Sequence, residues 1–193
     1  MSSRRQRGLS LIEVVIFIVV LGVAFAGMLI LYNQVTKASV DPMIRKQALA
    51  LASSLLEEIE LQAYTICDPD DPAVYTATVI GDCATGEVLG AEGAESRYSS
   101  VARFDNVSDY NNFRMGSGEP IADADIKTVD GTTIGALANY HVAVTIAQID
   151  SNELGAEIPT GEALRIRVVA THVPTGIQVV LQGYRARYAP KSP

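Results

Sequence analysis

The sequence has few of the residues that catalytic and nucleotide-binding sites require. It has no tryptophan, two histidines and two cysteines among 193 residues. It lacks a Gly-rich phosphate loop, an HExxH helix and a CxxC pair, so it indicates no nucleotide, zinc or redox site. His141 and His172 are far apart in the sequence, and no Ser–His–Asp arrangement is indicated around them. We therefore expect neither an enzyme nor a cofactor.

Basic residues are also scarce, and they are unevenly placed. The net charge is -7, and Arg4, Arg5 and Arg7 make the only strongly basic stretch. Beyond residue 8 the chain has 12 basic and 22 acidic side chains. Because phosphate backbones are bound by clustered lysine and arginine, this balance argues against nucleic acid as a partner.

One long stretch near the N-terminus has no charge at all. Residues 14–31 contain no Asp, Glu, Lys or Arg, and as a helix they extend about 27 Å, close to the thickness of the hydrocarbon core of a bilayer. The arginines before the stretch favour a cytoplasmic N-terminal side, which places the residues after Tyr32 in the bacterial periplasm or beyond. Glu13 lies at the start of this stretch, where an ionisable group is costly.

Three interpretations of this segment are open. The simplest is a signal anchor that stays in the membrane. A secretory signal would share the basic start and the apolar run, and Ala24-Phe25-Ala26 fits its cleavage site. Against a secretory signal, the apolar run continues to Leu31, and a discarded signal gains nothing from Glu13. The third interpretation accounts for both features.

The stretch Arg7-Gly8-Leu9-Ser10-Leu11-Ile12-Glu13 resembles the class III leader of type IV pilins and type II secretion pseudopilins. The resemblance implies that residues 1–8 are a leader, that prepilin peptidase cleaves between Gly8 and Leu9, and that the new amine of Leu9 is N-methylated. Glu13 matches the glutamate of the fifth mature position. Leu9 departs from the phenylalanine or methionine more usual at the new N-terminus.

The resemblance also implies an assembly role for Glu13. A carboxylate in hydrocarbon requires a partner cation, and cleavage after Gly8 creates one at Leu9. In a filament core, Glu13 of one subunit meets the amine of a neighbour and sets the axial register. The implied partners are prepilin peptidase, the inner membrane and other pilin subunits, and the protein passes from the inner membrane to an extracellular filament.

The mature chain divides into three predicted parts. Residues 9–32 form the transmembrane or filament-core helix, residues 33–63 an amphipathic helix, and residues 64–193 the periplasmic head. Asp41-Pro42 has the form of a helix restart, with Asp as N-cap and Pro at the first helical position, and a kink at Pro42 is the alternative.

The amphipathic helix carries an apolar stripe that must pack against another surface. The resemblance implies the sheet of its own head, and a coiled-coil dimer is the alternative. The apolar side chains that recur at helical spacing are Ala48, Ala52, Leu55, Leu56 and Ile59.

Cys67 and Cys83 are the only cysteines, and 15 residues lie between them. In an oxidising compartment we expect a disulfide, which would contribute about 3 kcal/mol, and two free buried thiols are the alternative. In the best-known major pilins the disulfide closes a loop near the C-terminus. The position just after the helix therefore argues against a standard major subunit.

Between the cysteines the chain is rich in carboxylates. Asp68, Asp70 and Asp71 are calcium candidates, because clustered carboxylates bind this ion. A second acidic cluster lies within residues 123–130. Neither has EF-hand spacing, and Asp and Pro also initiate turns. We therefore assign no metal to the sequence.

The C-terminal third alternates with the period of β-strands. On the last strand we expect Val179 and Leu181 on one face and Arg185 and Arg187 on the other. A helix stripe on a one-sided antiparallel sheet predicts an α+β fold, and the resemblance implies the type IV pilin fold. The strands are predicted at residues 140–147, 164–171 and 177–188.

Further signatures resemble the MshD-type minor pilins of the mannose-sensitive haemagglutinin (MSHA) pilus. These are DPMIRKQALALASSLLEEI at 41–59, CDPDDP at 67–72, FDNVSDY at 104–110 and the final hairpin. The resemblance implies a subunit that initiates or caps the pilus and supports surface attachment, with a surface ligand left unidentified. The alternatives are a minor pseudopilin of type II secretion and a membrane-anchored periplasmic binding protein outside any filament.

Overall fold

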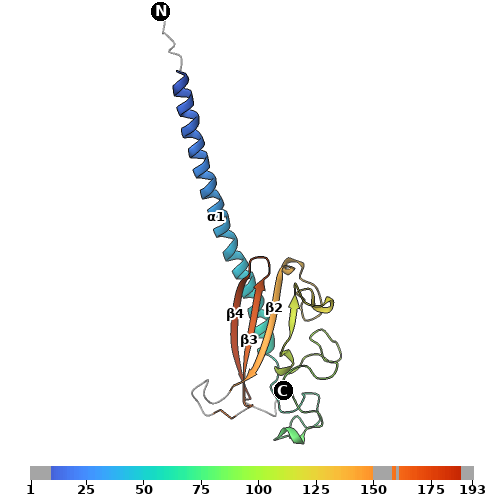
Figure 1. Ribbon diagram of the computed structural model, residues 1–193. Helices are drawn as coiled ribbons and strands as arrows, with labels where there is room; N and C mark the ends of the chain where they lie inside the picture. Colours follow the sequence, from blue (N-terminus) through green and yellow to red (C-terminus); the bar gives the residue numbers. More distant parts are fainter. Residues whose placement is uncertain (1–9, 150–157, 160, 188–193) are drawn as a thin grey trace, which may run out of the picture. The chain divides into compact units, whose positions relative to one another are not determined.

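A computed structural model describes residues 10–149, 158–159 and 161–187 of the chain (Figure 1). The chain divides into two compact units, Met1–Met43 and Ile44–Pro193. Helix α1, Leu11–Glu60, contributes residues to both and contains Pro42 in its interior. The predicted restart at Asp41-Pro42 is therefore wrong. An interior proline removes one backbone hydrogen bond, and the helical residues on both sides supply the others.

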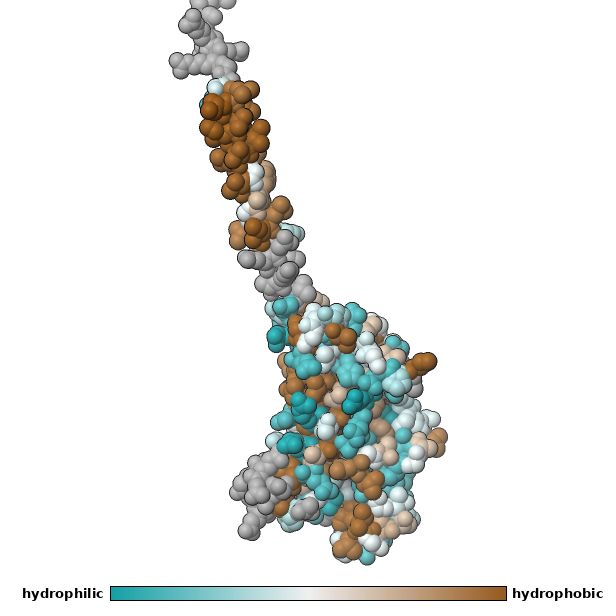
Figure 2. All heavy atoms as spheres, viewed as in Figure 1, coloured by the Kyte–Doolittle hydropathy of each residue, from teal (hydrophilic) through white to brown (hydrophobic). Residues whose placement is uncertain are grey.

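In the first unit, the face of α1 that Figure 2 shows is mostly apolar. Residues Leu11–Tyr32 are exposed, and this helical segment is long and apolar enough to cross a membrane. At about 1.5 Å per residue its 22 residues extend about 33 Å. A helix that is hydrophobic all round requires an apolar environment, which a bilayer or a packed filament core provides.

The second unit contains a four-stranded antiparallel sheet in the order β1-β2-β3-β4. The three predicted strands are confirmed, and the sheet also contains β1, which is too short to show alternation. The strands are β1 Arg114–Gly116, β2 Tyr140–Gln148, β3 Ala163–His172 and β4 Ile177–Ala186. In the described part of the chain, four 3-10 helices accompany them, η1 Ile80–Asp82, η2 Ser108–Tyr110, η3 Ile121–Asp123 and η4 Gly135–Leu137.

The C-terminal part of α1 packs on one face of this sheet (Figure 1). Four residues of the predicted stripe are at most 1% exposed, and Leu56 packs against them partly buried. The stripe is covered by the sheet of its own chain, so the coiled-coil alternative is wrong. The result is an α+β pilin-like fold. The four stripe residues are Ala48, Ala52, Leu55 and Ile59, and they share the core with Val142, Val144, Ile166 and Val168.

Strand β4 differs from the expectation in one respect. Val179, Leu181 and Arg185 share its part-buried face, because side chains two apart lie on the same side of a strand. The prediction that the arginines face the other way is wrong. The guanidinium of Arg185 donates to the Gln62 carbonyl at 3.1 Å, just beyond the end of α1.

Candidate functional site

The predicted leader junction lies outside the described residues, so cleavage between Gly8 and Leu9 and methylation of Leu9 stay predictions. Glu13 is described, and it lies in the first turn of α1 with an exposed side chain. A carboxylate at this position is favoured by the helix dipole. Within the described segments no residue forms an ion pair with Glu13.

The predicted disulfide between Cys67 and Cys83 is present, with a Cα–Cα distance of 5.4 Å. The alternative of two free thiols is therefore wrong. An isolated β-bridge and flanking backbone hydrogen bonds pair residues 66–68 with residues 85–87. The disulfide loop thus begins and ends in two segments held side by side.

The three calcium candidates within this loop have different environments. Asp71 accepts hydrogen bonds from the backbone N–H groups of Thr85 and Ala73, which lower the pKa of its carboxyl. The Asp71 carboxylate therefore stabilises the disulfide loop by accepting these two backbone hydrogen bonds. Asp68 and Asp70 instead lie near Asp105, which comes from the segment before η2.

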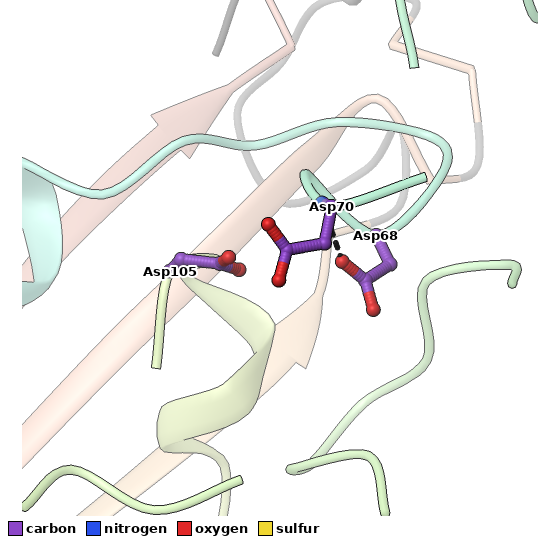
Figure 3. A group of neighbouring side chains, drawn as sticks. All are labelled: Asp68, Asp70 and Asp105. Carbon is purple, nitrogen blue, oxygen red and sulfur yellow. Dashed lines mark hydrogen bonds between the residues drawn. The ribbon is translucent and has the colours of Figure 1, made fainter. Parts of the chain in front are cut away.

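Figure 3 shows these three carboxylates converging, with the Asp70 backbone N–H donating to Asp68 at 2.7 Å. They are part of a larger acidic cluster of seven carboxylates, arranged in overlapping groups of three. Within each group, one oxygen from each residue lies within 4.8 Å of the others. The groups are Asp68, Asp70 and Asp105; Asp68, Glu92 and Glu95; and Glu87, Glu92 and Asp109.

The acidic cluster is electrostatically strained. Burial raises the pKa of Glu87 and of Asp109, and the charge of Asp109 raises that of Glu87 further. Burial also raises the pKa of Asp105 to about 6, and the nearby Asp68 adds to this shift. Like charges held close together in a partly dehydrated site favour a bound proton or a counter-ion. The cluster is therefore a candidate cation site.

The loop that carries Asp105 and Asp109 is fixed to the end of α1. The hydroxyl of Tyr110 donates to Glu58 at 2.9 Å, and the amide of Asn106 donates to the Thr65 hydroxyl at 2.9 Å. Tyr110 and Asn106 are buried. Burial raises the pKa of Tyr110, so its hydroxyl stays protonated as the donor. The acidic cluster therefore lies on a packed loop.

The two histidines belong to separate contacts. His141 Nε2 lies 2.8 Å from the Glu119 carboxylate, and His172 Nδ1 lies 2.8 Å from the Thr175 hydroxyl. Each histidine therefore has its own local hydrogen-bond partner, and the two do not share a site.

Comparison with known families identifies the N-terminal part of the chain. The prokaryotic N-terminal methylation motif matches residues 3–29, which include Gly8, Leu9, Glu13 and most of the apolar part of α1. The comparisons with curated proteins and with solved structures gave no match. A prepilin leader implies processing by prepilin peptidase and assembly with other pilins. The motif, the long apolar helix and the antiparallel sheet together support a type IV pilin-like protein, a pilin or a pseudopilin.

Proposed function

We propose that the protein is a minor pilin of an MSHA-type type IV pilus, acting in filament initiation or at the tip. The observation that carries the proposal is the methylation motif at residues 3–29, which runs directly into a membrane-length helix. Prepilin peptidase removes residues 1–8, and the head stays in the periplasm until the subunit enters the filament. The protein then supports pilus assembly and surface attachment.

In this proposal, Glu13 aligns the subunit in the filament core. Its exposed carboxylate lies beside an apolar surface and has no ion-pair partner in the described segments. The methylated amine of Leu9 in an adjacent subunit supplies the opposite charge. Because a buried carboxylate without a partner is costly, only the register that joins the two groups is stable.

A minor position fits the form of the head. Between the end of α1 and β1, more than fifty residues form loops and 3-10 turns, and the Cys67–Cys83 disulfide closes the first part of this region. Such a large loop region is easier to accommodate at a tip, where fewer neighbours surround a subunit, than along a closely packed filament. We also propose that the role is structural and not enzymatic, since His141 and His172 each belong to a different local contact.

Deletion of the gene in the host bacterium tests this proposal. We expect fewer or no surface pili, normal secretion of folded exoproteins, and recovery when the wild-type chain is supplied. Normal pili with lost secretion would contradict the pilus role and favour a minor pseudopilin. Normal pili and secretion, with an uncut leader, would favour a membrane-anchored binding protein.

A further inference from the structure

Two oxygens of the acidic cluster are buried without a hydrogen-bond partner in the described part of the chain. They are Oε2 of Glu87 and Oδ1 of Asp109. Asp109 is only 2% exposed, and its other oxygen accepts backbone N–H groups from Asp105 at 2.9 Å and Asn106 at 2.8 Å. A buried carboxylate oxygen left unpaired is costly, so this arrangement calls for a positive charge or a proton.

Glu92 completes a group whose dimensions suit a cation. One carboxylate oxygen from each of Glu87, Glu92 and Asp109 lies within 4.8 Å of the other two. Two oxygens bound to one Ca²⁺ at about 2.3–2.6 Å each are separated by at most about 5 Å. The three oxygens are therefore close enough to share one ion with little movement.

The side chains in this group are also held in place before any ion binds. The hydroxyl of Ser108 donates to one oxygen of Glu87 at 2.6 Å, and the backbone N–H of Val88 donates to one oxygen of Glu92 at 2.8 Å. Each donor occupies one carboxylate oxygen and leaves the second available. Together with the two backbone donors to Asp109, these bonds fix the ligands at little further entropic cost.

We propose that Glu87, Glu92 and Asp109 bind a divalent cation, and that the ion is Ca²⁺. Calcium accepts six to eight oxygens in flexible geometry, whereas Mg²⁺ requires a small octahedron and retains water. Asp68 and Glu95 lie around Glu92 and add nearby oxygens. The ion joins the segment of Glu87 and Glu92 to Asp109 in η2. This inference concerns the head alone and does not depend on the pilus assignment.

Two other arrangements could balance the same charge. A proton shared by Glu87 and Asp109 would satisfy both unpaired oxygens. Arg187 could also turn toward Glu87, since both line a cavity of about 60 Å³. In the structure, however, Arg187 lies 3.4 Å from the Glu162 carboxylate and 4.3 Å from the centre of the Tyr64 ring.

The test uses the full chain in detergent micelles, from which EGTA has removed bound metal. Thermal unfolding is then measured in three samples: with no addition, with 10 mM CaCl₂ and with 10 mM MgCl₂. Circular dichroism reports the Tm, and titration calorimetry with CaCl₂ reports the Kd. For a Kd of about 0.1 mM, Ca²⁺ in about 100-fold excess should raise the Tm by about 5–10 °C. Mg²⁺ should have a smaller effect.

Two variants and a control test whether the calcium-induced rise in Tm comes from the proposed site. Glu92→Gln keeps an acceptor for the Val88 N–H and removes one ligand charge, and Asp109→Asn keeps an acceptor for its two backbone donors. Both should fold and lose the calcium response. Asp125→Asn removes an exposed carboxylate outside the cluster and should keep it. No Tm shift in the wild-type chain, or the same shift in Glu92→Gln as in Asp125→Asn, would overturn the proposal.

Discussion

The guanidinium of Arg97 forms a two-pronged ion pair with the carboxylate of Glu58. Nε donates to Oε1 at 2.7 Å, and Nη2 donates to Oε2 at 2.6 Å. The side chain of Arg97 is 5% exposed, and its remaining nitrogen donates to the Lys127 carbonyl at 2.9 Å. Tyr110 donates to the same carboxylate. A single glutamate of α1 therefore anchors two separate loops of the head directly, and Arg97 links a third segment to them through the Lys127 carbonyl.

Replacing this arginine should weaken the head strongly. Arg97→Met leaves Glu58 largely buried without its cation, and the free energy of unfolding should fall by about 3 kcal/mol. Urea unfolding of the full chain in micelles, followed by near-UV circular dichroism, measures the change. Arg114→Met removes an exposed arginine and should change stability by less than about 0.5 kcal/mol. Equal losses in the two variants would show that the buried pair is not the cause.

Glycine at position 116 is required by backbone geometry. Its φ is +106°, and an added Cβ would overlap the carbonyl oxygen of Tyr140 on the paired strand. Gly116→Ala should therefore cost about 2–3 kcal/mol of stability. Gly118 has a similar φ of +98° but open space around it, so Gly118→Ala isolates the conformational part and should cost about 1 kcal/mol. The same urea assay compares them, and equal costs would refute the steric argument.

The disulfide loop should contribute measurably to stability. The double variant Cys67→Ser/Cys83→Ser should lose about 3 kcal/mol, because the unfolded chain gains the freedom of the open loop. Reduction with dithiothreitol should lower the Tm of the wild-type chain and leave the double variant unchanged. A wild-type Tm that is insensitive to complete reduction would contradict this expectation.

The longer strands could be predicted because one face of each packs on the core and the other is more exposed. Residues 140–147 of β2 alternate between buried and less buried positions, so the sequence carries a period of two. Three-residue β1 carries no such signal, and its place at the sheet edge depends on pairing with β2. The helix restart was mispredicted because Asp41-Pro42 is a purely local signal, and the helix-forming residues on both sides outweigh it.

The acidic cluster could be predicted only in part. Asp68 and Asp70 stand close together in the sequence, so their clustering is visible there. Glu87 and Glu92 lie in one short segment, whereas Asp109 comes from η2, so only the tertiary fold brings Asp109 beside them. Asp71 has the same local sequence signal as Asp68, but its hydrogen bonds to Thr85 and Ala73 assign it to loop closure.

The proposed assembly role of Glu13 predicts a separation of two steps. Prepilin peptidase should cleave Glu13→Ala largely as it cleaves the wild-type chain, because the substitution leaves Gly8 and Leu9 unchanged. Its incorporation into filaments should fall sharply, because the amine of Leu9 loses its partner. Immunoblots of membranes and sheared pili measure both steps. Ser10→Ala is the matched control. Normal incorporation of Glu13→Ala would contradict the proposal that Glu13 sets the axial register of the subunits.

Residues 1–8 are the proposed prepilin leader, and the N-terminal mass of the protein shows whether they are removed. The protein should be isolated from membranes and from sheared pili, digested, and its N-terminal peptide analysed by mass spectrometry. We expect a chain that starts at N-methylated Leu9 and is present in both fractions. A chain that retains Arg4, Arg5 and Arg7 and occurs only in membranes would contradict this proposal.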